Sequence, residues 1–127
     1  MHLHEYCENG VDVLQLQGEI DLHYAPVLRA LLKAKANSRC RSLLLDFSGV
    51  RFIDSTGIAA IVEYLRYSNT FGGRFCIGGL SEVVRTTFEI VRLDKAMPIF
   101  ADLGKAKEAL SYNALPRPSA PVFASAA

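Results

Sequence analysis

Leu43-Leu44-Leu45, followed by Asp46-Phe47, is a short apolar run near the middle of the 127-residue chain. A run of this kind is typical of a β-strand that is covered on both faces, as the central strands of parallel sheets are. We therefore predict a central strand here, with the other elements arranged around it.

Upstream of this run, the sequence predicts a β-hairpin and then a helix. Asn9-Gly10 favours the positive φ angles of a tight turn, and it separates two strand-like segments, 3–7 and 11–16. We expect the second strand to continue to Asp21. Pro26 is tolerable only in the first turn of a helix, and from this region the apolar residues recur at helical spacing: Tyr24, Val27, Leu28, Leu31 and Leu32.

Downstream, helices and strands alternate. We expect a loop from Ser48 to Ile53, and then a helix whose apolar positions begin at Ile58 and which ends near Phe71-Gly72-Gly73. A strand over 74–77, a helix capped by Ser81, an edge strand over 97–100 and a helix capped by Asp102 follow. This order predicts an α/β fold with a mixed, mainly parallel sheet and about four helices.

Composition and charge narrow the class of protein. The chain carries 14 Lys and Arg residues against 13 Asp and Glu residues, a balance that gives no general attraction to nucleic acid or anionic lipid. Polar residues interrupt every apolar stretch before it reaches membrane-spanning length, and no secretory signal is visible, so we expect a cytoplasmic protein. Cys7, Cys40 and Cys76 lack a C-x-x-C pattern and are expected to be plain buried thiols.

The chain is long enough for one domain, which we place at residues 1–112. Residues 113–127 contain Pro116, Pro118 and Pro121 among Ala and Ser, without a periodic apolar face. We therefore predict a flexible C-terminal tail.

Asp54-Ser55-Thr56-Gly57, at the junction between the central strand and the second predicted helix, is the segment most informative about function. Asp54 or Ser55 is expected to cap that helix, and a hydroxyl in its first turn is exposed because the apolar face starts only at Ile58. The positive end of the helix dipole would favour a phosphate there. The same residues also fit ordinary helix capping, with Gly57 packed against a neighbouring strand, and local physics leaves both interpretations open.

This segment resembles the signature of STAS domains, particularly of the bacterial anti-sigma factor antagonists, in which an Asp-Ser-Ser-Gly or Asp-Ser-Thr-Gly sequence contains a phosphorylated serine. The similarity extends upstream to Gly18-Glu19-Ile20-Asp21 and downstream to Ala109, so it covers the chain except for the tail. The resemblance implies a single STAS-type domain with Ser55 in the phosphoserine position.

The resemblance also implies a partner-switching cycle. The unphosphorylated protein binds an anti-sigma factor, which is also its serine kinase, and thereby releases a sigma factor; a metal-dependent serine phosphatase reverses the modification. The expected partner-binding residues are Asp21, Asp54, Ser55, Thr56 and Gly57.

Individual positions of this set leave alternatives open. Thr56 stands where serine is more frequent in this family, and it offers a second, less favoured acceptor. Asp54 fits either a residue that orients Ser55 or a part of the kinase recognition site. Asp21 fits either the docking surface or a cap of the first helix.

The sequence does not predict an enzyme, a cofactor or a metal site. No nucleophile with a base, phosphate-cradling loop or ligand cluster is visible, and His2, His4 and His23 lack partners at ligand spacing. Arg85 and Glu89 fit a solvated helix face. The competing function is a constitutive STAS scaffold subunit of a lipid-transport or sensory complex, which works without phosphoswitching.

Overall fold

A computed structural model describes residues 2–111, which form one five-stranded sheet with the strands in sequence order. The strands are β1 (His2–Glu8), β2 (Val11–Ile20), β3 (Ser42–Ile53), β4 (Arg74–Gly78) and β5 (Ile99–Phe100). The β1–β2 pair is antiparallel and the other three pairs are parallel. The predicted α/β class, the hairpin and the central place of Leu43–Leu45 are confirmed, whereas the predicted tail over 113–127 lies outside the described residues.

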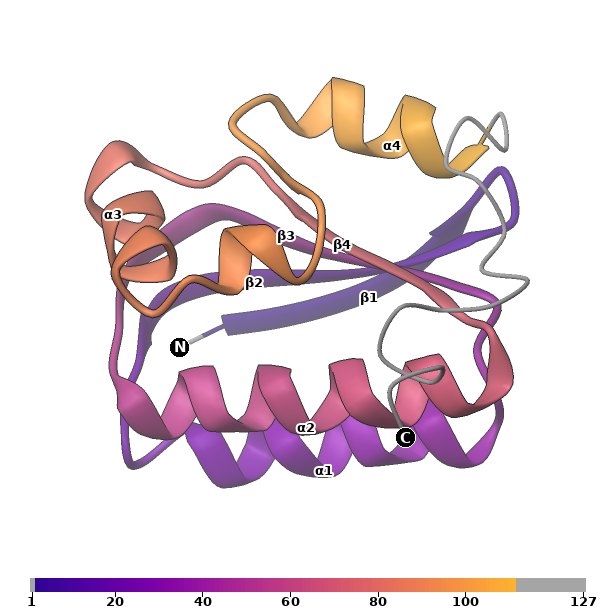
Figure 1. The fold of residues 1–127 in the computed structure, drawn as a ribbon, viewed down its shortest axis with the longest axis horizontal. Helices are drawn as coiled ribbons and strands as arrows, with labels where there is room; N and C mark the ends of the chain where they lie inside the picture. The colour runs from indigo at the N-terminus through magenta and orange to yellow at the C-terminus, as the bar shows by residue number, and fades with distance from the viewer. Residues whose placement is uncertain (1, 112–127) are drawn as a thin grey trace.

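Helices cover both faces of the sheet, as Figure 1 shows: α1 (Ala25–Asn37) and α2 (Ser55–Phe71) lie side by side below it, and α4 (Leu103–Ser111) lies above it. The side chains of each strand alternate between these two layers. Leu14, Leu45 and Ile77 belong to the larger core, while Val13 and Leu44 pack with Leu110 of α4. The third helix, α3 (Glu82–Ile90), places Phe88 edge-on against Phe47 of β3.

The caps predicted for the later helices are confirmed. The Ser81 hydroxyl accepts a hydrogen bond from the Val84 N–H, and the Asp102 carboxylate accepts one from the Lys105 N–H. Gly72 ends α2 in the left-handed conformation, with φ of 71°. Along the exposed face of α3, Arg85 and Glu89 form an ion pair one turn apart.

The predicted loop from Ser48 to Ile53 is wrong, because β3 continues as a strand to Ile53. Its pairing with β2 is interrupted by two register shifts, which disturb the alternation that would have revealed a strand in the sequence. Gly49 lies so close to β2 that an added Cβ would be 2.6 Å from Cγ of Gln17. The extension carries the chain to the same edge of the sheet at which β2 ends.

Two predictions of burial are also corrected. Cys7 is exposed because it lies on the edge strand β1, while Cys40 and Cys76 are buried free thiols. Burial raises the pKa of each buried thiol to about 12. Val27, expected on the apolar face of the first helix, is 48% exposed, whereas its neighbour Leu28 is fully buried.

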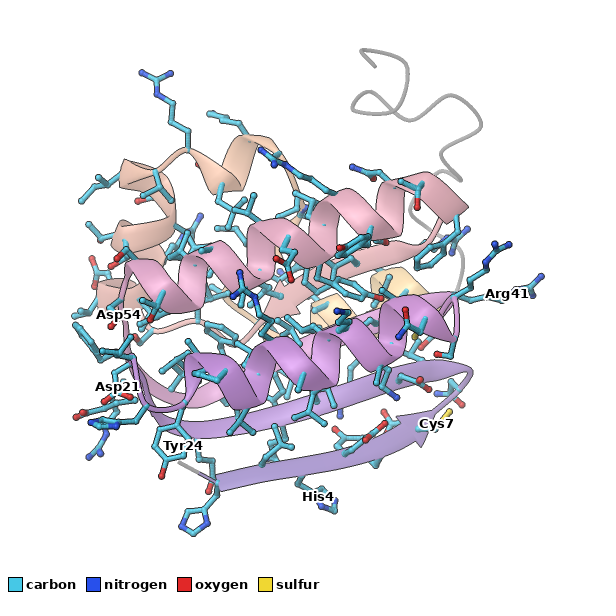
Figure 2. The ribbon with its side chains drawn as sticks, turned by 90° about the horizontal axis from the view of Figure 1, so that it is seen from below. His4, Cys7, Asp21, Tyr24, Arg41 and Asp54 are labelled. Atoms are coloured by element: carbon cyan, nitrogen blue, oxygen red, sulfur yellow. The ribbon has the colours of Figure 1, made fainter. Side chains whose placement is uncertain are left out.

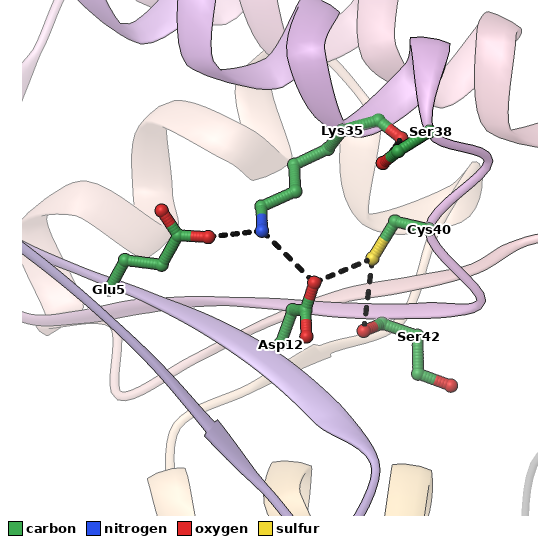
Figure 3. Close-up of polar contacts among 6 residues, drawn as sticks. All are labelled: Glu5, Asp12, Lys35, Ser38, Cys40 and Ser42. Carbon is green, nitrogen blue, oxygen red and sulfur yellow. Dashed lines mark hydrogen bonds and ion pairs between the residues drawn. The ribbon is translucent and has the colours of Figure 1, made fainter.

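A polar network fixes the end of α1 to the β-hairpin (Figure 3). Lys35 pairs with Glu5 and with the Asp12 carboxylate, and the Cys40 thiol donates to Asp12 over 3.4 Å. Burial opposes the charge of Asp12, but the hydrogen bonds from Lys35 and Cys40 outweigh it and lower the pKa of this carboxyl. Burial likewise opposes the charge of Lys35, and its bonds to Glu5 and Asp12 outweigh it and raise the pKa of this amine.

Arg39 occupies an unusual backbone conformation just after α1. It has φ of 53°, and the N–H groups of Arg39 and Cys40 return to the carbonyls of Ala36 and Lys35. Glycine is the usual residue at this place in such a helix end. The left-handed conformation costs an ordinary residue about 1–2 kcal/mol, more than the ~0.3–1 kcal/mol that an exposed cation gains from the helix dipole. We therefore predict that glycine would be tolerated at position 39 without loss of stability.

The two faces of α1 give a direct test of the packing. We expect Leu28→Ala to lower the free energy of unfolding by about 2–5 kcal/mol, because it removes a fully buried side chain. We expect Val27→Ala to change it by less than about 0.5 kcal/mol, because Val27 faces solvent. Urea denaturation of both variants measures this difference, and an equal loss in the two would contradict the helix orientation.

Candidate functional site

The candidate site forms where β2, β3 and α2 meet, at the carboxyl ends of the parallel strands. The Asp54 N–H donates to the Ile20 carbonyl over 3.1 Å, which joins the end of β3 to the end of β2. Figure 2 shows Asp21 and Asp54 at the same end of the molecule. The structure thus brings together the two segments that the sequence singled out, 18–21 and 54–57.

Gly57 is buried in the first turn of α2, against the ends of both strands. A Cβ on Gly57 would lie 2.7 Å from Cγ2 of Ile20 and 2.8 Å from Cγ1 of Ile53. A larger residue would therefore push the start of α2 away from the sheet. Packing alone explains glycine at this position, and contact of Gly57 with a partner stays a prediction.

Asp54 is the N-cap of α2 and is bonded to the residues that follow it. Its Oδ1 atom accepts hydrogen bonds from the N–H groups of Thr56 (2.9 Å) and Gly57 (3.2 Å), and also from the Thr56 hydroxyl. The bond from the Thr56 hydroxyl is the largest influence on the pKa of Asp54; burial opposes it, and the N–H groups of Gly57, Thr56 and Leu22 add to it. The pKa of Asp54 is consequently lowered, and its carboxylate is a charged, ordered group at neutral pH.

The side chains of Ser55 and Thr56 differ in their surroundings. The Thr56 hydroxyl is bonded to Asp54 and its residue is half-buried, whereas Ser55 is exposed and lines a shallow hollow along α2 with Ile58, Ala59 and others. Within residues 2–111, the Asp54 carboxylate is therefore hydrogen-bonded to Thr56 and makes no hydrogen bond with Ser55. Of the two hydroxyls, the one on Ser55 is open to an approaching molecule.

Asp21 shapes the loop between β2 and α1. Its carboxylate accepts a hydrogen bond from the His23 N–H over 3.0 Å, and its carbonyl accepts bonds from the N–H groups of Tyr24 and Ala25. Tyr24 is the N-cap of α1 and provides no side-chain cap. The Asp21 side chain thus caps the turn that leads into α1, and its part in a docking surface stays a prediction.

Two apolar residues beside this site were not singled out from the sequence. Leu22, next to Asp21, is 67% exposed, and Phe52, two residues before Asp54, is 47% exposed. Leu22 and Thr56 also line a hollow between α1 and α2 whose other walls include Ala25, Pro26 and Ala59. The irregular end of β3 concealed Phe52, because a strand with bulges does not show which of its residues face outward.

The candidate site is built from exposed polar and apolar side chains. Within residues 2–111, no group of three or more His, Cys, Asp or Glu side chains is placed to hold a metal ion. No helix in this part of the chain is long and apolar enough to cross a membrane. What the site presents is an exposed serine beside two aspartates and exposed apolar side chains.

Comparison with known proteins gives consistent matches. The family model of the STAS domain matches residues 6–106. The anti-sigma-F factor antagonist RsfB of Mycobacterium tuberculosis is 33% identical over 101 residues, which is 77% of this chain and 80% of RsfB. The crystal structure of an anti-sigma factor antagonist from Mycobacterium paratuberculosis has a TM-score of 0.79 and 26% identity, covering 86% of this chain and 92% of that one.

The phosphorylated form of the Bacillus cell fate determinant SpoIIAA shares the fold. Its TM-score is 0.67 at 21% identity, with 84% of this chain and 97% of that chain covered. The predicted resemblance to anti-sigma factor antagonists with a STAS domain is confirmed by these comparisons.

The cap of α2 gives a pH-dependent prediction. We expect Asp54→Ala to lower the free energy of unfolding by about 0.5–2 kcal/mol at pH 7, because the N–H groups of Thr56 and Gly57 lose their acceptor. The pKa of Asp54 is lowered in the folded state, so its contribution is complete above the unfolded pKa of about 4 and is lost as the pH falls through the folded value. Urea denaturation of wild type and variant between pH 7 and pH 2.5 tests this, and a difference that grows on acidification would contradict it.

Proposed function

The chain belongs to the STAS domain family, and from this premise we propose that it is an anti-sigma factor antagonist switched by phosphorylation of Ser55. In the unphosphorylated form it binds an anti-sigma factor and so releases a sigma factor. Phosphorylation of Ser55 ends that binding. The observation that carries the proposal is the exposed hydroxyl of Ser55 in the first turn of α2, beside a Thr56 hydroxyl that is already bonded.

The position of Ser55 suits a phosphate that leaves the fold intact. The Ser55 side chain points to solvent at the N-terminal end of a 17-residue helix, where the dipole favours negative charge. The core contacts of this turn are made by Gly57 and Ile58, which the modification does not touch. The switch therefore acts on the surface and requires no refolding.

Charge explains why binding is lost. A phosphate adds about −1.5 to −2 charges beside the Asp54 carboxylate, on a surface that also carries Asp21 and the exposed Leu22 and Phe52. A partner that packs against the apolar side chains would have to desolvate this phosphate. A tenfold loss of affinity needs only ~1.4 kcal/mol, so one such unfavourable contact is sufficient to change the occupancy.

The partners follow from this role. We infer an anti-sigma factor that is also a serine kinase, and a metal-dependent serine phosphatase that restores the unmodified Ser55. The protein itself contributes a binding surface, has no catalytic role and acts in the cytoplasm. The docking surface comprises Asp21, Asp54, Ser55 and Thr56, with Gly57 holding the turn against the sheet.

The decisive prediction concerns the acceptor. After incubation with the cognate kinase and ATP, we expect mass spectrometry to locate the phosphate on Ser55, in wild type and in Thr56→Ala. Ser55→Ala should stay unmodified and bind the anti-sigma factor as wild type does, while Ser55→Asp should bind at least about tenfold more weakly, because a carboxylate supplies part of the phosphate charge. Titration calorimetry measures both affinities.

Each alternative gives a distinct result. Phosphate on Thr56 or Ser48, with Ser55 unmodified, would overturn the assignment of the acceptor. Co-purification with a transporter ATPase and permease, and no phosphate on any residue, would instead support a constitutive scaffold. Circular dichroism of Ser55→Asp serves as the control, because weaker binding is informative only if that variant keeps the fold.

A further inference from the structure

A second surface lies at the end of the molecule away from Ser55, where α1 and α2 finish. A hollow there, which we call the basic hollow, is lined by Lys33, Arg39, Arg41, Tyr67, Thr70 and Phe71. Figure 2 shows Arg41 reaching into solvent at the opposite end of these helices from Asp54. The basic hollow therefore lies at the far end of α1 and α2 from Ser55, although it shares Lys33 and Tyr67 with the two hollows beside the proposed docking surface.

The three cations of this hollow have no acidic partner within residues 2–111. The ion pairs in that part of the chain involve Arg29, Lys35, Arg85 and Lys107, and the neighbouring Lys35 is held by Glu5 and Asp12. No Asp or Glu lines the hollow. Positive charges placed together without acidic partners create a positive electrostatic potential, which attracts anions.

Arg39 and Arg41 face solvent because the residue between them faces inward. Cys40 is buried and its thiol donates to Asp12 and to the Ser42 carbonyl. Both arginines are exposed, on either side of this anchored residue. The network of Figure 3 thus fixes the backbone that carries the two guanidinium groups.

The left-handed backbone at Arg39 argues against a purely structural role for its side chain. Glycine would satisfy the same helix end at a lower conformational cost, and the helix dipole offers an exposed cation less than that cost. Arg92 also has a positive φ, of 60°, but it follows α3 and lies outside the basic hollow. Arg39 therefore combines a left-handed backbone with a place among the cations of the basic hollow, whereas Arg92 has the left-handed backbone alone.

The size and walls of the basic hollow suit a small ligand. Its volume is about 570 Å³, within the ~300–1,000 Å³ of small-molecule sites. Guanidinium groups match phosphate oxygens with two parallel hydrogen bonds. Tyr67 and Phe71 add aromatic walls on the α2 side.

From these observations we propose that the basic hollow binds a small anion that carries two or more phosphate groups. Arg39 and Arg41 would each hold a phosphate group, and Lys33 would supply a third positive charge from α1. The site and its ligand are independent of Ser55 and of the proposed partner switch. The bound group could be inorganic or part of a phosphorylated metabolite, since both present the same chemistry to the arginines.

Inorganic pyrophosphate is the probe. In NMR titrations of the full chain at about 150 mM salt, where surface charges further apart than ~8 Å are largely screened, we expect saturable shifts of the amides at 33–41 and 67–71. Sulfate at the same ionic strength should bind more weakly. A parallel titration with fructose 1,6-bisphosphate distinguishes a site for organic phosphates, which binds it at least as tightly, from one restricted to inorganic pyrophosphate.

Arg39→Gly and Arg92→Gly form a matched pair, because each removes one positive charge and relieves one left-handed arginine. We expect Arg39→Gly and Arg41→Gln to weaken pyrophosphate binding by about tenfold or more, as the loss of a charge-assisted contact implies. Arg92→Gly should stay within about twofold of wild type, and so should Ser55→Asp. Thermal unfolding should find Arg39→Gly at least as stable as wild type, so that lost binding cannot be attributed to lost structure.

Three results would overturn the proposal. The first is the absence of saturable pyrophosphate binding at millimolar concentration. The second is an equal loss of pyrophosphate affinity in Arg39→Gly and Arg92→Gly, which would indicate a general effect of net charge. The third is binding through Arg39 to vesicles of anionic phospholipid when pyrophosphate does not bind, which would identify a membrane-facing surface instead.

Discussion

The close approach of Gly57 to Ile20 and Ile53 is the constraint on which the functional end of the molecule depends. Because no Cβ intervenes, the first turn of α2 lies directly on the ends of β2 and β3. The hydrogen bond from the Asp54 N–H to the Ile20 carbonyl fixes the same junction from the backbone side. Together these contacts determine where Ser55 emerges and place it beside the loop that carries Asp21 and Leu22.

A junction held in this way favours a switch that works by surface chemistry. The residues beneath the site are buried core residues, and β2 and β3 share the most extensive strand pairing of the sheet, from Asp12 to Ile20. In the proposed switch, a phosphate on Ser55 would therefore rest on a well-packed support and would act through the charge and hydration of the exposed surface. Partner exchange, as proposed, would then depend on differences of a few kcal/mol in binding, which one phosphate can supply.

Sequence patterns correctly predicted the helices and strands whose apolar residues recur at regular spacing. The central run at Leu43–Leu45, the Asn9-Gly10 turn and the caps at Ser81 and Asp102 are local signals, and the structure agrees with each. The continuation of β3 through Ser48–Ile53 could not be seen, because two register shifts break the alternation on which strand prediction relies. Exposure of Cys7 and Val27 is likewise set by tertiary contacts, namely the edge position of β1 and the side on which α1 meets the sheet.

At the candidate site, residue types indicated a cap and an exposed hydroxyl, but only the fold shows that Asp54 binds Thr56 and that Leu22 and Phe52 are neighbours of the site.

The hydrogen bond between Thr56 and Asp54 distinguishes the surroundings of the two hydroxyls in the first turn of α2. Successive helical residues point about 100° apart, so only one of the two hydroxyls can turn back to the capping carboxylate while the other faces outward. To receive a phosphate, Thr56 would have to give up its bond to a carboxylate whose pKa is already lowered by that bond, and the new phosphate would then face the same negative charge. Ser55 avoids the first of these costs, because its side chain is exposed and, among the residues that the structure describes, Asp54 is bonded to Thr56 and Gly57 instead. In the proposed switch, Thr56 engages Asp54 and thereby leaves Ser55 as the hydroxyl that a kinase would reach.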